Sequence, residues 1–193
     1  LASGLTGTVP ITHTQVTGED SMLELGVKVL GNTASAILQV RDQLNREVID
    51  RATDLLAGAA SVELYAVGQS AMVVQDAQFK FLRLGLPCAV HTDPRVQELA
   101  AAVIPAQAVA LIVSNSGRGP ELANVADRAR ERGAKVIAIT ASQSPLARKA
   151  DVALIVDHAE DTSTQVTMVS RILHLLIIDM LAVGLAMRHA RPG

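Results

Sequence analysis

Hydroxyl and amide side chains gather at two turns of the chain, each directly after an apolar run: "AVGQSAM" and "VSNSGRGP". The polar and glycine residues of these turns are Gly68, Gln69 and Ser70 in the first, and Ser114, Asn115, Ser116 and Gly117 in the second. Backbone N–H groups at a helix start favour an anion, and serine hydroxyls can donate hydrogen bonds to its oxygens. The two turns therefore predict a binding site for a phosphate monoester.

Other interpretations of these residues stay open. A single serine at a helix start commonly caps the helix or satisfies turn backbone, but two such turns at equivalent places favour an anion site. Arg118, directly after the second turn, could form a bidentate fork with phosphate or carboxylate. Alternatively, Arg118 is solvated or paired with an acid such as Glu121.

Two acidic residues, Glu160 and Asp161, follow the last apolar run. They could form a polar wall of the same site or supply an acid–base carboxylate, or they could lie in a solvated loop. The histidines lack the spacing of metal ligands, and the turns contain neither a dinucleotide fingerprint nor a Walker loop. We therefore expect no metal and no bound cofactor.

Five short apolar runs are typical of β-strands: 62–67, 87–91, 109–113, 135–140 and 152–156. Most are apolar throughout, as expected of parallel strands covered on both faces by helices. Helix-length segments separate them at 70–84, 96–102, 120–132 and 145–150. This order predicts an α/β fold, a three-layer αβα sandwich, whose ligands bind beyond the carboxyl ends of the strands, where both polar turns lie.

Further helices are expected on both sides of the strands. Apolar spacing over 21–44 and 48–56 predicts two helices before the first strand. A final helix over about 163–188 carries more apolar surface than one sheet face requires, which suggests a subunit interface and a homodimer. Its most apolar part, residues 172–187, is interrupted by a histidine and an aspartate and is short for a bilayer span. We therefore expect no membrane segment.

Composition excludes several classes of function. The net charge is −2 and aromatic residues make up 2%, so the chain has neither a broad basic surface nor stacking platforms for nucleic acid. Cys88 is the single cysteine, and we expect a buried structural thiol. Residues 1–20 resemble a tail or linker and contain no secretory signal, so we expect a cytoplasmic protein.

Three longer segments point to a family: "YAVGQSAMVVQDAQFKFLRLGLP", "VSNSGRGPELANVADRARERGAKVIAIT" followed by "SPLARKADVAL", and "EDTSTQVTMVSRILHLLIIDMLAVGLAMR". Over residues 19–190 they resemble the sugar isomerase (SIS) domain of bacterial RpiR-type transcriptional regulators. The resemblance implies a five-stranded parallel sheet with flavodoxin-like topology, dimerisation, and binding of phosphorylated sugars or sugar acids. It also implies that 1–18 is the end of a helix-turn-helix domain with its linker, that DNA is bound only through that domain, and that 19–193 is the SIS domain.

The resemblance assigns roles to residues of the two turns. The serines that match the family's phosphate contacts are Ser70, Ser114 and Ser116, and the glycines that match its turn positions are Gly68 and Gly117. Two positions depart from the pattern. Met72 stands where related regulators often have a second serine, and Gly119 where they often have threonine or serine, so two hydroxyl donors are missing.

Three functions are compatible with these residues. We expect an effector-sensing and dimerisation domain of a regulator of sugar metabolism, with a ligand such as 2-keto-3-deoxy-6-phosphogluconate. The alternative is a stand-alone sugar-phosphate isomerase, but that reaction needs a poised base, and the second turn offers Arg118 and Gly119 rather than a carboxylate. An oligomerisation module whose ligand site has decayed is the third.

Overall fold

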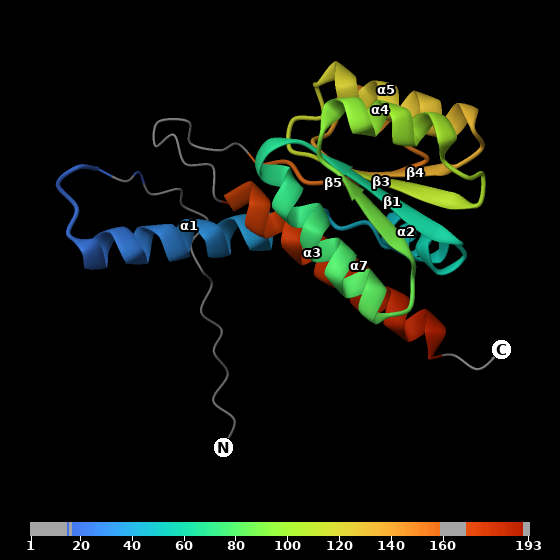
Figure 1. Ribbon diagram of the computed structural model, residues 1–193. Coiled ribbons are helices and arrows are strands. Elements are labelled where there is room, and N and C mark those ends of the chain that lie inside the picture. Colours follow the sequence, from blue (N-terminus) through green and yellow to red (C-terminus); the bar gives the residue numbers. More distant parts are fainter. Residues whose placement is uncertain (1–14, 16, 159–168, 191–193) are drawn as a thin grey trace. The chain divides into compact units, whose positions relative to one another are not determined.

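The computed structural model describes residues 15, 17–158 and 169–190 (Figure 1). Five strands form its central sheet: β1 (Ser61–Ala66), β2 (Cys88–His91), β3 (Ala108–Ser114), β4 (Lys135–Thr140) and β5 (Val152–Ile155). Their order is β2-β1-β3-β4-β5, and all neighbouring pairs are parallel. This is the flavodoxin-like doubly wound order, so the predicted fold class is confirmed.

Helices cover both faces of the sheet in the unit from Leu44 onward. They are α2 (Arg46–Ala57), α3 (Ala71–Arg83) with the preceding 3₁₀ turn η1 (Gly68–Ser70), α4 (Pro94–Val103), α5 (Pro120–Glu131), α6 (Pro145–Lys149) and α7 (Val169–His189). The helices α2, α3 and α7 pack on one face, whereas α4, α5 and α6 pack on the other (Figure 1). The three-layer sandwich predicted from the alternating runs is therefore confirmed.

The first helix, α1 (Met22–Gln43), belongs to a separate compact unit. It begins with a capping box, because the backbone N–H of Ser21 donates to Glu24 Oε2 at 2.8 Å and that of Glu24 donates to Ser21 Oγ at 3.3 Å. The expected helix from Ser21 is thus confirmed. The expected domain tail, residues 1–18, lies almost wholly outside the described residues and stays a prediction.

The two central strands are buried on both faces. Every residue of β3 except Ser114 is buried, and so is every residue of β4 except Lys135. This explains why these runs are apolar throughout, since helices cover both of their faces. At the edge strand β2, Cys88 is half-buried rather than buried, and its desolvation raises the pKa of the thiol, which disfavours the reactive thiolate.

The final helix α7 is the most apolar helix of the structure, and it is long and apolar enough to cross a membrane by length and composition alone. However, it packs against α2 and α3, and the residues that it buries include Leu173, Ile177 and Leu185. Asp179, which interrupts its apolar stretch, accepts from Lys80 of α3 at 2.6 Å. The expected helical residues 163–168 lie outside the described part of the chain.

Candidate functional site

The two polar turns begin at the same edge of the sheet. Strands β1 and β3 are parallel neighbours, and their last paired residues are Ala66 and Val113. From there the chain leaves β1 toward α3 and β2 on one side, and leaves β3 toward α5 and β4 on the other. Such a switch in direction opens a crevice beyond the carboxyl ends of the strands, which is where doubly wound proteins bind ligands.

The first turn leaves its helix start unoccupied. Gly68 has a φ of +58°, and a Cβ placed on it would meet no atom of the described residues within 4 Å. Ser70 is buried, yet its side chain makes no capping hydrogen bond to α3, and the first turn of α3 contains no acidic residue. The partial positive charge of this helix start is therefore not used by the helix's own side chains, which suits an external anion.

The second turn uses its own hydroxyl groups. The backbone N–H of Gly117 donates to Ser114 Oγ at 3.1 Å, and that of Arg118 donates to Ser116 Oγ at 3.4 Å. A serine hydroxyl that accepts a hydrogen bond still has its own O–H to donate. Both serines can therefore shape the turn and still offer a proton to an anion.

Gly117 is required by its neighbours as well as by its backbone. Its φ is +59°, and a Cβ there would lie 2.3 Å from Thr140 Oγ1 and 2.5 Å from Ser144 Oγ. The backbone N–H of Leu146 also donates to the Gly117 carbonyl at 3.2 Å. The segment after β4 thus supports the second turn, a role that the sequence interpretation did not assign to it.

A small pocket joins the two turns to the start of α7. Its lining residues are Gln69, Ser70, Asn115, Ser170, Arg171 and His174. Of the predicted residues, Gln69, Ser70 and Asn115 line this pocket, whereas Gly68, Ser114, Ser116 and Gly117 belong to the same two turns but do not line it. The three residues of α7 were missed, although their polar types inside an otherwise apolar helix were a usable signal.

Arg118 lies outside the lining of this pocket and is exposed. In the part of the chain that the structure describes, it forms no ion pair with Glu121. The Glu121 carboxylate instead turns toward the start of α5, where its Oε2 lies 3.0 Å from the place of a Cβ on Gly119. Arg118 is thus exposed and not paired with Glu121 in the described residues, and its contact with an anion stays a prediction.

The acidic segment after β5 is described only as far as residue 158. Glu160 and Asp161 lie outside the described residues, so their predicted roles remain predictions. Asp157, which precedes them, accepts from the backbone N–H of Ser142 at 2.7 Å and joins this loop to the one after β4. Within 15, 17–158 and 169–190, no group of three or more His, Cys, Asp or Glu residues could hold a metal ion.

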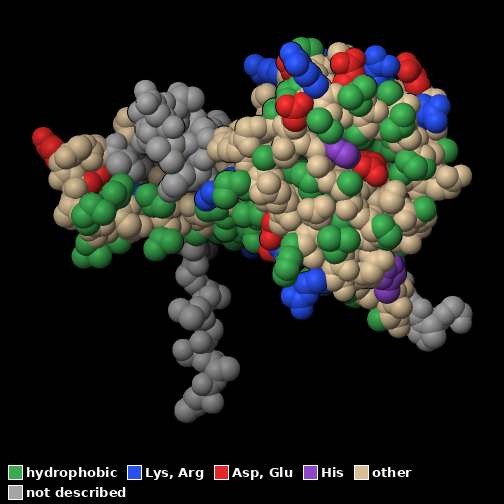
Figure 2. Space-filling view, viewed as in Figure 1, with side chains coloured by type: hydrophobic (Ala, Val, Ile, Leu, Met, Phe, Trp, Pro, Cys, Tyr) green, Lys and Arg blue, Asp and Glu red, His purple; other side chains and the backbone are tan. Residues whose placement is uncertain are grey.

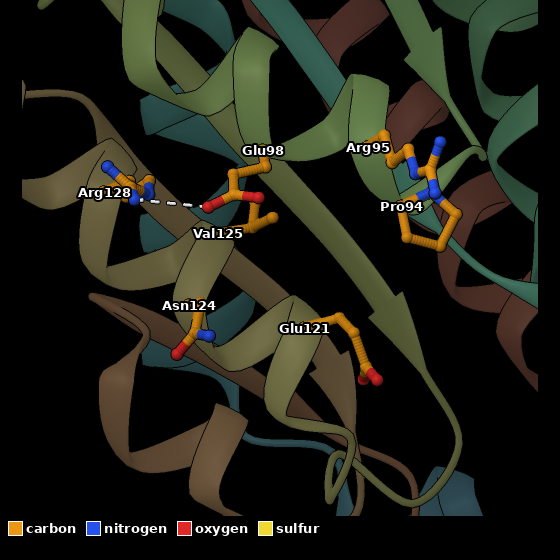
Figure 3. Close-up of a pocket in the computed structure, with 7 residues that line it drawn as sticks. All are labelled: Pro94, Arg95, Glu98, Glu121, Asn124, Val125 and Arg128. Atoms are coloured by element: carbon orange, nitrogen blue, oxygen red, sulfur yellow. Dashed lines mark hydrogen bonds and ion pairs between the residues drawn. The ribbon is translucent and has the colours of Figure 1, made fainter.

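A larger groove of about 200 Å³ lies between α4 and α5 (Figure 3). Its lining residues are Pro94, Arg95, Glu98, Glu121, Asn124, Val125 and Arg128. Arg128 donates to Glu98 Oε1 at 3.3 Å across the groove, and acidic and basic side chains alternate over this part of the surface (Figures 2 and 3). Two carboxylates and two guanidinium groups line this groove, so it has no net positive charge to attract a phosphate.

Comparisons with known proteins identify relatives of this chain. The chain is 52% identical to the bifunctional protein glk of Paraburkholderia xenovorans over 193 residues, all of this chain but 30% of that protein. It is 35% identical to the HTH-type transcriptional regulator HexR of Escherichia coli, covering 97% of this chain and 65% of HexR.

Among solved structures, the Vibrio vulnificus NanR protein complexed with ManNAc-6P matches with a TM-score of 0.76 and 20% identity, over 86% of this chain and 66% of that one. At this identity the match shows a common fold. The family model of the SIS domain matches residues 55–184, which include both polar turns and most of α7. The chain therefore belongs to the SIS domain family.

Proposed function

We propose that this SIS domain senses an effector for a transcriptional regulator of sugar metabolism, and that the effector is a phosphorylated sugar or sugar acid. The observation that carries the proposal is the pocket in which Ser70, Asn115 and the start of α7 meet at the carboxyl edge of the sheet. The regulator name of the HexR relative and the sugar phosphate bound to NanR support it. DNA contact is assigned to a separate helix-turn-helix domain.

The chemistry of the turns explains how a phosphate would be held. Its oxygens would accept hydrogen bonds from the first backbone N–H groups of α3 and from the serine hydroxyls, which together surround one anion. Such a ligand contacts elements that are separate in the sequence, so binding favours the arrangement in which they lie close together. An effector with this preference shifts the population of conformations available to an attached domain.

Calorimetry with paired ligands tests the proposal. Glucose 6-phosphate, N-acetylmannosamine 6-phosphate and 2-keto-3-deoxy-6-phosphogluconate are each compared with their dephosphorylated forms. We expect at least one phosphorylated compound to bind, and Ser114→Ala to weaken it roughly 10- to 150-fold, the value of a hydrogen bond to a charged group.

Ser61→Ala is the matched control, because Ser61 lies at the opposite, amino-terminal end of β1. It should leave binding unchanged. If Ser114→Ala binds as tightly as the parent protein, or if a dephosphorylated compound competes equally well, the proposal is wrong.

Catalysis is the second candidate, and one observation favours it. His174 lines the pocket and is 1% exposed, and an imidazole is the commonest general acid–base group in enzymes. An isomerase would exchange the hydrogen next to the sugar carbonyl with solvent. Proton NMR of each phosphorylated sugar in D₂O with the protein detects this exchange; we expect none, and exchange that His174→Ala abolishes would establish an isomerase instead.

We also propose that the domain forms a homodimer. The neighbouring helices α3 and α7 expose apolar side chains, among them Phe79 at 62%, Leu82 at 53%, Val183 at 60% and Met187 at 55%. An apolar face of this kind is typical of a subunit interface. Light scattering should give twice the chain mass at micromolar concentration, and Phe79→Glu should shift it toward one chain mass.

A further inference from the structure

We infer that Arg171 supplies the cationic contact to the bound anion and makes the pocket selective for a dianionic phosphate monoester. This inference rests on the proposed function and assigns a charge to the site. Arg171 lies in the first turn of α7 and lines the pocket together with Ser70 and Asn115. It is therefore placed where both polar turns converge.

The guanidinium of Arg171 has no strong partner in the described part of the chain. Among the described residues, its buried Nε has no hydrogen-bond acceptor, and its Nη1 donates to the sulfur of Met72 at 3.9 Å and to no other atom. A thioether is a weak acceptor, and a buried donor without an acceptor costs free energy. Native proteins rarely leave such donors unsatisfied, so an unsatisfied one at a pocket points to a ligand.

Arg188, the other arginine of α7, has a structural role, because it joins two helices through ion pairs. Arg188, near the end of α7, donates to Asp50 and Asp54 of α2 at 2.9 Å each. Lys80 of α3 is paired with Asp76 and Asp179. These cations join helices through carboxylates, whereas Arg171 forms no ion pair among the residues that the structure describes.

The chemistry of the group fixes the class of ligand. A guanidinium presents parallel N–H donors that match the oxygens of phosphate, and it stays charged at every physiological pH. The serine hydroxyls and backbone amides of the turns are neutral, so they distinguish a dianion from a monoanion less strongly. Arg171 adds the full charge that favours the dianion, whereas Arg118 is exposed and lies outside the pocket lining.

Binding of inorganic phosphate and of glucose 6-phosphate to a set of variants tests the inference. Arg171→Gln should weaken both probes roughly 10- to 150-fold, and Arg171→Lys, which keeps the charge but not the fork, should weaken them less. Arg132→Gln, at the exposed C-terminal end of α5, is the matched control and should bind like the parent. Gluconate, a carboxylate without phosphate, should bind more weakly than either probe.

The pH profile provides a readout that a purely structural role of Arg171 would not change. Glucose 6-phosphate, a phosphate monoester, loses its second charge near pH 6, so parent affinity for it should fall as the pH is lowered through that value. His174 lines the same pocket and is present in both the parent and Arg171→Gln, so the difference between their profiles reports on Arg171. In Arg171→Gln this fall should be shallower, because the group that prefers the dianion is absent. Thermal melting without ligand shows whether each variant is folded. If Arg171→Gln is not, the affinity of Arg171→Lys decides, and a lysine variant that binds both probes as tightly as the parent overturns the inference.

The outcomes separate this inference from the proposed function. If Ser114→Ala weakens both probes while folded Arg171→Gln binds as tightly as the parent, Arg171 is not the cationic contact and the proposed function stands. If the parent binds neither inorganic phosphate nor any of the three sugar phosphates, both ideas are wrong. If gluconate binds as tightly as glucose 6-phosphate, the selectivity for phosphate is refuted.

Discussion

The two polar turns share residue types and differ in what their hydroxyl groups already do. Ser70 leaves the start of α3 uncapped, and no acid lies in the first turn of that helix. Ser114 and Ser116 instead accept hydrogen bonds from backbone N–H groups of their own turn, and Glu121 lies in the first turn of α5. The first turn is thus open to an external anion, whereas the hydroxyl groups of the second turn already accept hydrogen bonds from their own backbone.

The glycines of the two turns differ in the same sense. Gly68 and Gly117 have nearly the same positive φ, +58° and +59°. A Cβ would find open space at Gly68 but would overlap Thr140 and Ser144 at Gly117. The same backbone geometry therefore leaves space for a ligand beside the first turn and allows close packing against Thr140 and Ser144 in the second.

The largest expected effect comes from adding one methyl group to each glycine. Gly117→Ala should lower the free energy of unfolding by about 3 kcal/mol, because left-handed strain and a steric overlap add together. Gly68→Ala carries only the strain and should cost about 1 kcal/mol. Urea unfolding followed by circular dichroism measures both, and equal losses would contradict the distinction between an open and a packed turn.

Removing hydroxyl groups should give a smaller contrast. Ser114→Ala deletes the acceptor for the Gly117 N–H and should lower the free energy of unfolding by about 1 kcal/mol. Ser70→Ala removes a hydroxyl that caps nothing, so the change should stay within about 0.5 kcal/mol. The same urea titrations apply. A larger loss for Ser70→Ala than for Ser114→Ala would reverse the assignment of the open turn.

Neutralising the acid at the second helix start should sharpen the comparison further. Glu121→Gln removes a negative charge from the first turn of α5, the helix that follows the second polar turn. It should raise phosphate affinity about two- to threefold, while the lost dipole interaction destabilises α5 by about 0.5 kcal/mol. Calorimetry at low and high salt measures the gain, which should shrink at high salt. Glu131→Gln, at the far end of α5, is the control, and an equal gain there would show a nonspecific charge effect.

The sequence predicted the layers and both turns because these features are local. An apolar run shows that a strand is covered on both faces, and a run followed by glycine and serine indicates where the strand ends. In contrast, the requirement for glycine at position 117 depends on Thr140 and Ser144, which reach the turn only through the strand order. No local pattern distinguishes Gly117 from Gly68.

The part of the pocket contributed by α7 was missed for a similar reason. Met72 and Arg171 are 99 residues apart in the chain and meet only because α3 and α7 pack on the same face of the sheet. The apolar spacing of the last helix predicted a subunit interface and gave no role to its polar first turn. Histidine and arginine inside such a helix were the signal, since polar side chains in a buried helix need a partner.

The smallest expected effect is at Gly119, the N-cap of α5. A glycine has no side chain that could cap the helix, so this helix start lacks a side-chain capping bond. The φ of −61° and ψ of 125° at Gly119 suit a serine, so Gly119→Ser should raise the free energy of unfolding by a few tenths of a kcal/mol through a new cap. The added Cβ would lie 3.0 Å from Glu121 Oε2, but this is the end of a flexible side chain that can move aside. Gly119→Ala introduces the same Cβ without the hydroxyl, so the difference between the two variants in urea isolates the cap. A serine variant no more stable than the alanine variant would show that Glu121 already satisfies this helix start, and that the second turn is closed more completely than its serines alone indicate.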